Sequence, residues 1–318
     1  MKFNFHIIFI SVALICCNSA NSQESGAGYD YYKKLNESEK RLIEFKDNDM
    51  ALRNKVNQLA VINKSRKKFN AQEVKLDILA SRVANKQCIE AAENGYLSHW
   101  NLAGEKPYMR YAYAGGHDHV SENAFSETNS EEYTMAQNVA ADLMKRGHGS
   151  FMGERAPNDG HKQNVINKNH NYVGLGYAIS GGQFRYNEEY IDRYLDFINV
   201  PGNMKINETG SLTVDTKGKC FLFFVTIYRE ETPKPMNVKQ LSQTGSYADF
   251  SDKVYVNMPP WDLAKYRHEN IYTIPLKFTG DGIYYVQIFT DKKEFSGYGS
   301  VNTSGKDPVS GIVIRVKR

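Results

Sequence analysis

The feature that most constrains this chain is a change of pattern near residue 200. Before it, apolar residues recur at three- and four-residue spacings over long stretches, which is typical of amphipathic helices. After it, the sequence holds only short apolar runs separated by turn residues, which predicts strands. We therefore expect two folding units, an α+β domain over residues 50–199 and an all-β sandwich over residues 200–318.

The first unit combines expected helices with a few short strands. The expected helices cover residues 37–68, 75–94 and 130–146. Gly95 and Gly147 would end the second and third of them. Strands are expected at 172–179, whose glycines permit close backbone approach, at 190–198 after a turn at Gly181 and Gly182, and within 97–125. This mixture favours an α/β/α layered domain.

The second unit reads as strands throughout. Its expected strands cover residues 211–215, 220–228, 253–258, 271–278, 282–290 and 311–317. Short strands at this spacing indicate a β-sandwich. Trp261 follows two prolines in an expected loop, where it could contact a carbohydrate or a protein.

The first 22 residues have the pattern of a secretory signal peptide. Lys2 precedes an apolar run, and Ala20 and Ser22 stand at the −3 and −1 positions of a cleavage before Gln23. The run is shorter than the roughly 20 residues of a membrane-spanning helix, and Cys17 leaves open a lipid anchor. We expect a secreted or extracellular protein, with a periplasmic or surface-attached one as the alternative. Residues 23–49 form an extension that is loose to about residue 35 and helical beyond it.

Composition excludes several classes of protein. The chain has 40 Lys and Arg against 36 Asp and Glu, an excess too small to indicate nucleic-acid binding. No later stretch approaches transmembrane length, so no transmembrane segment is expected. Beyond the leader only Cys88 and Cys220 remain, which is too few for a disulfide scaffold. They are either two buried thiols or one interdomain bridge.

Two histidines and a glutamate are the candidate functional residues. His99, Glu122 and His161 each stand at the edge of an apolar segment beside turn formers. Two neutral imidazoles and a carboxylate can bind zinc or another divalent cation, or act as general-base partners. No HExxH, GxSxG or Walker motif is present. The remaining candidates, His117, His119 and His148, are interpreted as surface residues.

The ordered motifs around these residues resemble those of a known family. They are VINKSRKKF with Asn63 and Arg66, the helix that ends before His99, SEN with Ser121 where glycine is usual, GHKQNVI at His161, and then VGLGYAI and YLDF. Over about residues 50–199 the chain resembles the CAP superfamily. This is the sperm-coating-protein-like extracellular domain of cysteine-rich secretory proteins, antigen 5 allergens and pathogenesis-related proteins. The basic run at residues 65–69 is expected to be a solvated helix end.

The resemblance implies an α/β/α sandwich with a central cleft. His99 and His161 would be the two cleft histidines, which bind zinc or another divalent cation in several members, and Glu122 the first glutamate. The second glutamate has no secure match: Asp142 and Glu154 are its candidates, with Glu154 as a supporting cleft residue. The family's extracellular disulfides are absent, as in bacterial members.

Three functions are compatible with this reading. The first is a secreted binding protein whose cleft holds a divalent cation or small ligand, and whose β domain docks an extracellular protein or glycan. The second is a metal-dependent, peptidase-like hydrolase, for which His99, Glu122 and His161 are the candidate catalytic residues. Its nucleophile would be water, Ser98 or Ser121. The third is a lipid or sterol carrier.

A carrier would need an apolar groove near Tyr108, Tyr111 and Tyr113, which otherwise read as ordinary packing residues. The binding protein is the reading we favour, because the polar set is incomplete and no activated nucleophile is evident.

Overall fold

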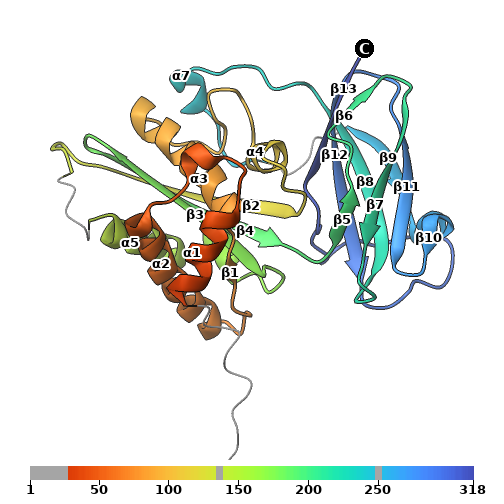
Figure 1. The fold of residues 1–318 in the computed structure, drawn as a ribbon, viewed down its shortest axis with the longest axis horizontal. Coiled ribbons are helices and arrows are strands. Elements are labelled where there is room, and N and C mark those ends of the chain that lie inside the picture. Colours follow the sequence, from red (N-terminus) through yellow and green to blue (C-terminus); the bar gives the residue numbers. More distant parts are fainter. Residues whose placement is uncertain (1–27, 134–138, 248–252) are drawn as a thin grey trace, which may run out of the picture.

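A computed structural model describes residues 28–133, 139–247 and 253–318. Helices surround a sheet in the first part of the chain, and strands make up most of the second part, as Figure 1 shows. The expected signal peptide, residues 1–22, lies outside the described residues. Within them, no helix has both the length and the apolar character needed to cross a bilayer.

The first part is built on a four-stranded sheet in the order β1-β3-β4-β2. Its strands are β1 (Lys75–Leu76), β2 (His119–Thr128), β3 (Tyr172–Ser180) and β4 (Gln183–Asp192). β1 is parallel to β3, and the other pairs are antiparallel. The turn at Gly181 and Gly182 and the strand expected within 97–125 are both confirmed. β2 lies at an edge of the sheet.

Helices cover both faces of this sheet. α3 (Ile78–Asn94) and α4 (Pro107–Tyr113) lie on one face, and α2 (Asp49–Lys68), α5 (Val139–Gly153) and α6 (Gly160–Ile166) lie on the other. β3 places Gly174 and Gly176 against α3, where a Cβ would collide with Ala80 and Ala84. The missing side chains let the helix approach the sheet closely, and the α/β/α arrangement is confirmed.

The N-terminal segment differs from expectation. Part of the stretch expected to be loose forms α1 (Tyr29–Ser38), and η1 (Ile43–Phe45) follows it. The helix expected over 37–68 starts only at Asp49. The reason is local, because Leu42 takes a left-handed conformation with φ of 48°, and Asn48 then caps α2 by accepting a hydrogen bond from Ala51 N. Tyr32 of α1 is buried in the core beneath α2.

Two other helix ends also move. The helix expected over 75–94 begins at Ile78, because Lys75 and Leu76 pair with β3 and Asp77 caps the helix. It ends at Gly95 as expected, with φ of 68°. The helix expected over 130–146 is non-helical at residues 130–133 and runs past Gly147 to Gly153 as α5, with residues 134–138 outside the described chain.

Two sheets form the second part. One has the order β10-β11-β7-β5, and the other has the order β6-β13-β12-β8-β9. The first contains β5 (Asp196–Asn199), β7 (Thr209–Asp215), β10 (Arg267–His268) and β11 (Ile271–Lys277). The second contains β6 (Asn203–Lys205), β8 (Phe221–Glu230), β9 (Val254–Met258), β12 (Gly282–Asp291) and β13 (Ile312–Lys317).

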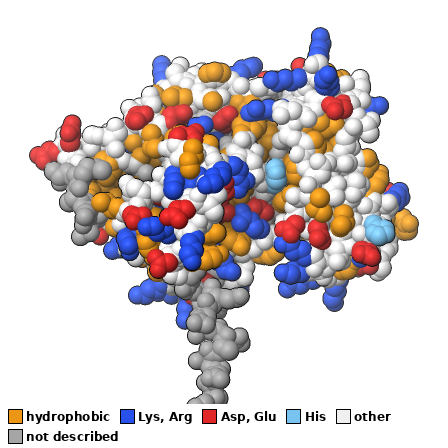
Figure 2. Space-filling view, in the orientation of Figure 1, with side chains coloured by type: hydrophobic (Ala, Val, Ile, Leu, Met, Phe, Trp, Pro, Cys, Tyr) orange, Lys and Arg blue, Asp and Glu red, His pale blue; other side chains and the backbone are white. Residues whose placement is uncertain are grey.

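All six strands expected in the second part are present, and one core lies between the two sheets. The strand expected over 190–198 is in fact two. β4 ends at Asp192, and β5 joins the sandwich by pairing with β7. Figure 2 shows acidic and basic side chains interspersed over one face of the molecule, in keeping with its small net charge.

The two parts share a core through β12. Tyr284 and Val286 of this strand face the sandwich interior, whereas Ile283 and Tyr285 face the first part, in a cluster with Leu79 and Val120. Strand alternation explains both sets, since successive side chains point to opposite faces. β12 is apolar from Ile283 to Val286 because both of its faces are buried there.

Three expectations about individual residues can be compared with the structure. Cys88 is buried, Cys220 is half-buried, and both are free thiols. Trp261 was expected in a loop but lies in the short helix α8 (Pro260–Leu263), where its ring is half-buried against Phe295 and Tyr298. The basic run does end α2, but Arg66 is fully buried and donates to backbone carbonyls, so this part of the run is not solvated.

Candidate functional site

His99 lies in a short loop that follows α3. Gly95 ends the helix, and the loop is then held by two side chains of α3. Glu90 accepts hydrogen bonds from the Tyr96 hydroxyl at 2.6 Å and from Leu102 N at 2.7 Å. Gln87 donates to the Ser98 carbonyl at 3.3 Å. Contacts from one helix face therefore fix the position of the His99 backbone.

Glu122 is the buried centre of this site. It accepts hydrogen bonds from His99 Nδ1 at 2.8 Å, from Arg110 Nη2 at 2.5 Å and from Asn187 Nδ2 at 2.6 Å. Arg110 also donates to the His99 carbonyl at 2.6 Å. One guanidinium thus holds both members of the His99–Glu122 pair, and rotation of either would break a charge-assisted bond.

The charge on Glu122 sets the tautomer of His99. Burial alone would raise the pKa of Glu122, but Arg110 and then His99 lower it below its ordinary value. An ionised carboxylate can only accept, so His99 Nδ1 carries a proton. Nε2 is left facing away from Glu122 and forms no hydrogen bond to any residue in the described ranges. A neutral His99 therefore presents a lone pair at Nε2.

A second carboxyl group lies beside Glu122. Glu189 of β4 is the direct cross-strand partner of Glu122 and is fully buried, with Arg110 Nη2 at 3.6 Å. Its two oxygens have no hydrogen-bond partner among the described residues. Burial, and then the negative charge of Glu122, raise the pKa of Glu189 well above its ordinary value. Glu189 is therefore the member of the pair that keeps its proton to the higher pH.

His161 forms a second histidine–carboxylate pair with Glu154. Glu154 follows α5 directly, and its carboxylate accepts from His161 Nδ1 at 2.5 Å. It also accepts from the backbone N of His161 at 3.0 Å and of Lys162 at 3.2 Å, which ties it to the start of α6. The His161 ring stacks on Phe151 at 5.1 Å.

The other candidate for the second glutamate position lies elsewhere. The Asp142 side chain is 64% exposed, and its ion pair is with Lys145 at 3.6 Å. The structure thus puts Glu154, and not Asp142, beside His161.

The two pairs are attached to opposite faces of the same strand. Glu122 points to one face of β2, whereas the next residue, Asn123, points to the other and donates to the His161 carbonyl at 3.0 Å. Within residues 28–133, 139–247 and 253–318, no three His, Cys, Asp or Glu side chains are gathered as a metal ion would require. The four candidate residues therefore form two separate pairs along one edge strand.

A segment from the second part of the chain covers His99. We call residues 231–247, between β8 and the start of the undescribed stretch, the strap. Tyr247 accepts a hydrogen bond from Glu122 N at 3.0 Å, and its ring lies 4.8 Å from the His99 ring and 6.4 Å from the Trp100 ring. Ser98 Oγ and Thr244 Oγ1 are 2.7 Å apart. The His99–Glu122 pair is closed on this side by a tyrosine.

Further anchors hold the strap along its length. Met236 N donates to the Leu102 carbonyl at 2.8 Å, and Leu241 of α7 (Val238–Leu241) is fully buried against Ala91 and Tyr96. A Cβ at Gly104 would collide with the Lys234 carbonyl. Figure 1 shows α7 lying over the first part of the molecule, far from the strands that precede and follow it.

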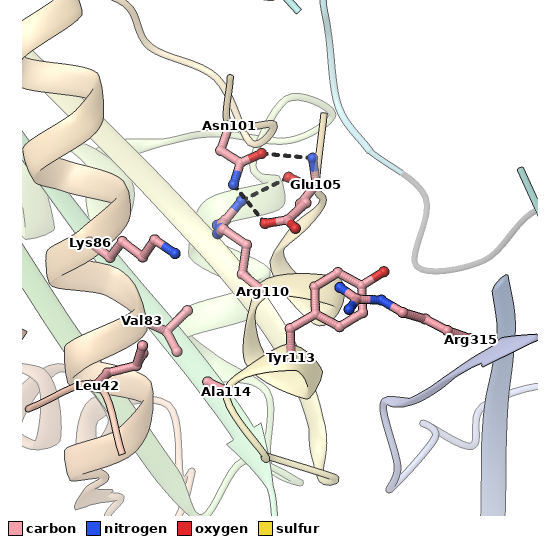
Figure 3. A pocket seen from close by; sticks show the side chains of 9 residues that line it. All are labelled: Leu42, Val83, Lys86, Asn101, Glu105, Arg110, Tyr113, Ala114 and Arg315. Carbon is pink, nitrogen blue, oxygen red and sulfur yellow. Dashed lines mark hydrogen bonds between the residues drawn. The ribbon is translucent and has the colours of Figure 1, made fainter. Parts of the chain in front are cut away.

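Arg110 also lines a small pocket of about 140 Å³ between α3 and α4. Figure 3 shows its guanidinium near Asn101 and Glu105, with Lys86 on one side and Tyr113 on the other. Arg110 Nη1 donates to the Glu105 carbonyl at 3.3 Å. The arginine that orders His99 and Glu122 is therefore fixed from its far side as well.

Two histidines interpreted as surface residues are in fact buried. His119 Nδ1 lies 2.9 Å from Asp192, whose other oxygen binds His170 at 2.7 Å. His148 Nδ1 lies 2.9 Å from Glu188, in the core on the opposite side of the sheet from Glu189. These rings tolerate burial because a buried carboxylate pairs with each. His117 is half-buried, with its ring 5.6 Å from the Phe197 ring.

The serines proposed as nucleophiles are committed to other partners. Ser98 Oγ is paired with Thr244, and Ser121 Oγ donates to Asn164 Oδ1 at 2.7 Å. Ser65 Oγ does lie 2.9 Å from His148 Nε2, in the order serine, histidine, carboxylate that continues to Glu188. The His148 ring is only 2% exposed, so this chain of bonds satisfies a buried ring and does not present a base to a substrate.

Arg110 and Glu189 are site residues that the sequence reasoning missed. Glu189 had a detectable signal, because Glu188 and Glu189 are adjacent carboxylates in the strand YNEEYI and must lie on opposite faces. Arg110 had none, since PYMRYAY reads as an ordinary amphipathic turn of helix.

Comparisons with known proteins identify the domain that carries this site. The CAP family, described as the cysteine-rich secretory protein family, matches residues 59–191. Comparison with curated protein sequences gives no significant match.

Among solved structures, the chain is similar to an outer surface protein from Borrelia burgdorferi. The two are 19% identical over 44% of this chain and 93% of that one, with a TM-score of 0.35. It is also similar to an extracellular protein containing an SCP domain from Bacillus anthracis, with 17% identity over 43% of this chain and 39% of that one and a TM-score of 0.33.

The family match spans the helices and strands that place His99, Glu122, Glu154 and His161, and the α/β/α arrangement agrees with it. The additional β sheets lie after the matched residues. The chain is a CAP superfamily protein, with its CAP domain in residues 59–191.

Proposed function

We propose that this is an exported CAP-domain binding protein whose two histidine–carboxylate pairs take up a divalent cation, with zinc as the favoured ion. The observation that supports this proposal is that the two histidine–carboxylate pairs have the same arrangement. In both, a carboxylate lies at Nδ1, which directs the Nε2 lone pair outward. A histidine held in this way is the usual zinc ligand, because the carboxylate fixes the tautomer and raises the basicity of the ring.

The position of β2 supports a shared ion. β2 is an edge strand, so groups attached to its opposite faces can approach each other along its free edge. His99 and His161 would supply Nε2 ligands, and Glu122 and Glu154 would hold the rings in place. Two histidines leave coordination positions for water or for a ligand of the protein. In this proposal the two histidines would bind the ion, and the two glutamates would orient the histidine rings.

The same contacts weigh against the other two functions. A hydrolase with a serine nucleophile would need that serine beside a base, yet Ser98 and Ser121 are bonded to Thr244 and Asn164. A sterol carrier would need a groove near Tyr108 and Tyr111, but both are buried and Tyr108 stacks on Tyr285 at 4.2 Å. The pocket between α3 and α4 beside Tyr113, at about 140 Å³, is smaller than the roughly 300 Å³ at which ligand pockets begin. A second pocket beside Tyr113, at about 310 Å³, only reaches that limit.

Zinc titration of the purified chain tests the proposal. We expect one zinc ion per chain at neutral pH, lost in His99→Ala and in His161→Ala. The ion should be retained in His268→Ala, which removes an exposed histidine of β10. Zinc binding that is absent, or unchanged in both cleft variants, would contradict the proposal.

A further inference from the structure

A large cavity lies away from the histidine pairs. We propose that this cavity, which we call the junction cleft, binds a multiply anionic saccharide. Its volume is about 770 Å³, within the range of about 300–1,000 Å³ for ligand sites. One wall is the α6–β3 loop and the end of β4, and the other is the β7–β8 turn and the β12–β13 connection. The cleft thus lies where the CAP domain meets the sandwich, a common position for ligands.

Its lining carries an excess of positive charge. Six side chains are Lys or Arg, and three are Asp. Of these aspartates, Asp192 is buried between two histidines, and Asp291 is paired with Lys306 at 2.5 Å. Asp307 accepts from the amides of Asn167 and Asn169, each at 2.8 Å. All three acids are therefore occupied.

Three of the six cations have no carboxylate partner. Arg193, Lys217 and Lys306 form ion pairs, whereas no ion pair to a described residue involves the remaining ones. Those three are Lys168, Lys219 and Lys292. All are exposed, so each is solvated and available to a ligand. The small net charge of the chain is thus unevenly distributed, with uncompensated lysines gathered around one cavity.

The arrangement calls for a ligand with several negative charges. Lys168 comes from the CAP domain, Lys219 from the turn between β7 and β8, and Lys292 from the segment after β12. A single inorganic anion is far smaller than the cleft and could not engage all three lysines. A chain of sugars bearing sulfate or carboxylate groups could do so, because its charges are spaced along an extended backbone.

The neutral part of the lining favours a saccharide over an acidic peptide. Asn70, Gln72 and Thr290 contribute amide and hydroxyl groups, which suit the hydroxyls of a sugar. The apolar side chains of the lining are those of Tyr194, Leu195, Cys220, Pro308 and Val309, of which Leu195 and Val309 are buried. A peptide would find few pockets for side chains, so its affinity would come from charge alone.

Binding is tested with the full chain and a heparin-derived sulfated octasaccharide, beside an unsulfated uronate octasaccharide. We expect saturable binding of at least one of them, and the comparison identifies the anionic group. The variant K168A/K219A/K292A should bind about tenfold more weakly, because it loses three exposed and therefore individually weak ion pairs to the ligand. The slope of log Kd against log salt should also fall. The control K34A/K64A/K145A removes three exposed lysines elsewhere and should bind as the wild type does.

A covalent readout gives an independent measure. Cys220 lines the cleft, whereas Cys88 is buried, so in a chain that starts at Gln23, without Cys16 and Cys17, a maleimide should label Cys220 selectively at pH 8. Bound saccharide should slow this labelling in the wild type and not in the triple variant. Protection should survive in His99→Ala, which separates this site from the histidine pairs.

Three results would overturn the proposal. The first is the absence of saturable binding by either saccharide, and the second is equal binding by the wild type and the cleft variant. The third is polyglutamate or inorganic sulfate protecting Cys220 as well as the octasaccharides do.

Discussion

At the scale of single residues, the unusual feature is a pair of carboxyl groups in one buried position. Glu122 and Glu189 are cross-strand partners, and only one is fully hydrogen-bonded. Arg110 stabilises the ionised form of Glu122, and Glu122 in turn disfavours ionisation of Glu189. Ionising both carboxyl groups of a buried cross-strand pair would cost too much free energy, so one group is charged and the other is neutral.

The raised pKa of Glu189 predicts a pH-dependent loss of stability. Above its ordinary pKa the unfolded chain releases this proton and the folded chain keeps it, so stability falls as pH rises. Glu189→Gln mimics the protonated form and removes that fall. We expect the variant to be more stable than the wild type at pH 8 by about 1 kcal/mol or more, and nearly equal to it at pH 4. Urea unfolding at both pH values measures this, and parallel pH profiles for the two proteins would contradict it.

At the scale of elements, the strap decides access to His99. It leaves β8, crosses to the CAP domain, and is held there by Leu241, by the Met236 amide and by Tyr247. These contacts are few compared with those of a core strand. A ligand of His99 must therefore displace Tyr247 or enter from the side, and the strap can open without global unfolding.

Leu241→Ala should loosen the strap selectively. Truncating a buried leucine costs about 2 kcal/mol or more, and here the cost falls on docking of α7. We expect hydrogen exchange at the Met236 amide to accelerate about 30-fold, with faster proteolysis between residues 231 and 247. The control Val238→Ala lies in the same helix at a position that is 38% exposed and should leave both rates unchanged. Equal exchange rates in the two variants would show that α7 does not hold the strap.

At the scale of the whole molecule, the CAP domain and the sandwich are joined by a core and not by a linker alone. Tyr108 of α4 stacks on Tyr285 of β12, and its hydroxyl is bonded to Glu230 of β8. Ile283 and Val313 extend the same cluster. Burial on this scale couples the stability of the two parts, and it also fixes the walls of the junction cleft relative to each other.

Calorimetry can test that coupling. We expect the wild type to unfold in one transition and Tyr285→Ala to unfold in two, because removing a buried aromatic ring costs about 3–5 kcal/mol at the shared core. Phe289→Ala changes a half-buried residue of the same strand and should retain a single transition. Two transitions in the wild type would mean that the parts fold independently.

Much of the fold was predictable because its signals are local. Gly95 at a helix end, the alternation in residues 271–278 and the turn at Gly181 each depend on neighbours a few residues away. Where the predicted helix boundaries were wrong, the cause was a local alternative conformation. Leu42 interrupts a helical pattern, and Lys75 and Leu76 leave their helix because β3 offers them pairing partners.

The candidate site was predictable in its parts and not in its assembly. The motifs selected His99, Glu122 and His161, which the structure places in two histidine–carboxylate pairs, and the structure adds the groups that hold them. Arg110 binds Glu122, which is 12 residues away in the sequence, and strand pairing brings Glu189 to Glu122. Glu154, and not Asp142, lies beside His161 because α5 ends just before Glu154.

The sequence alone thus determined the order of the two units, most of their strands and the residues that could carry chemistry, since these follow from periodicity and side-chain type. Only the tertiary structure decided what each group meets. Tyr247 covers His99 from far along the chain, and the lysines of the junction cleft come from segments as distant as residues 168 and 292. Such contacts form because apolar faces must be buried together, and no local pattern records which faces those will be.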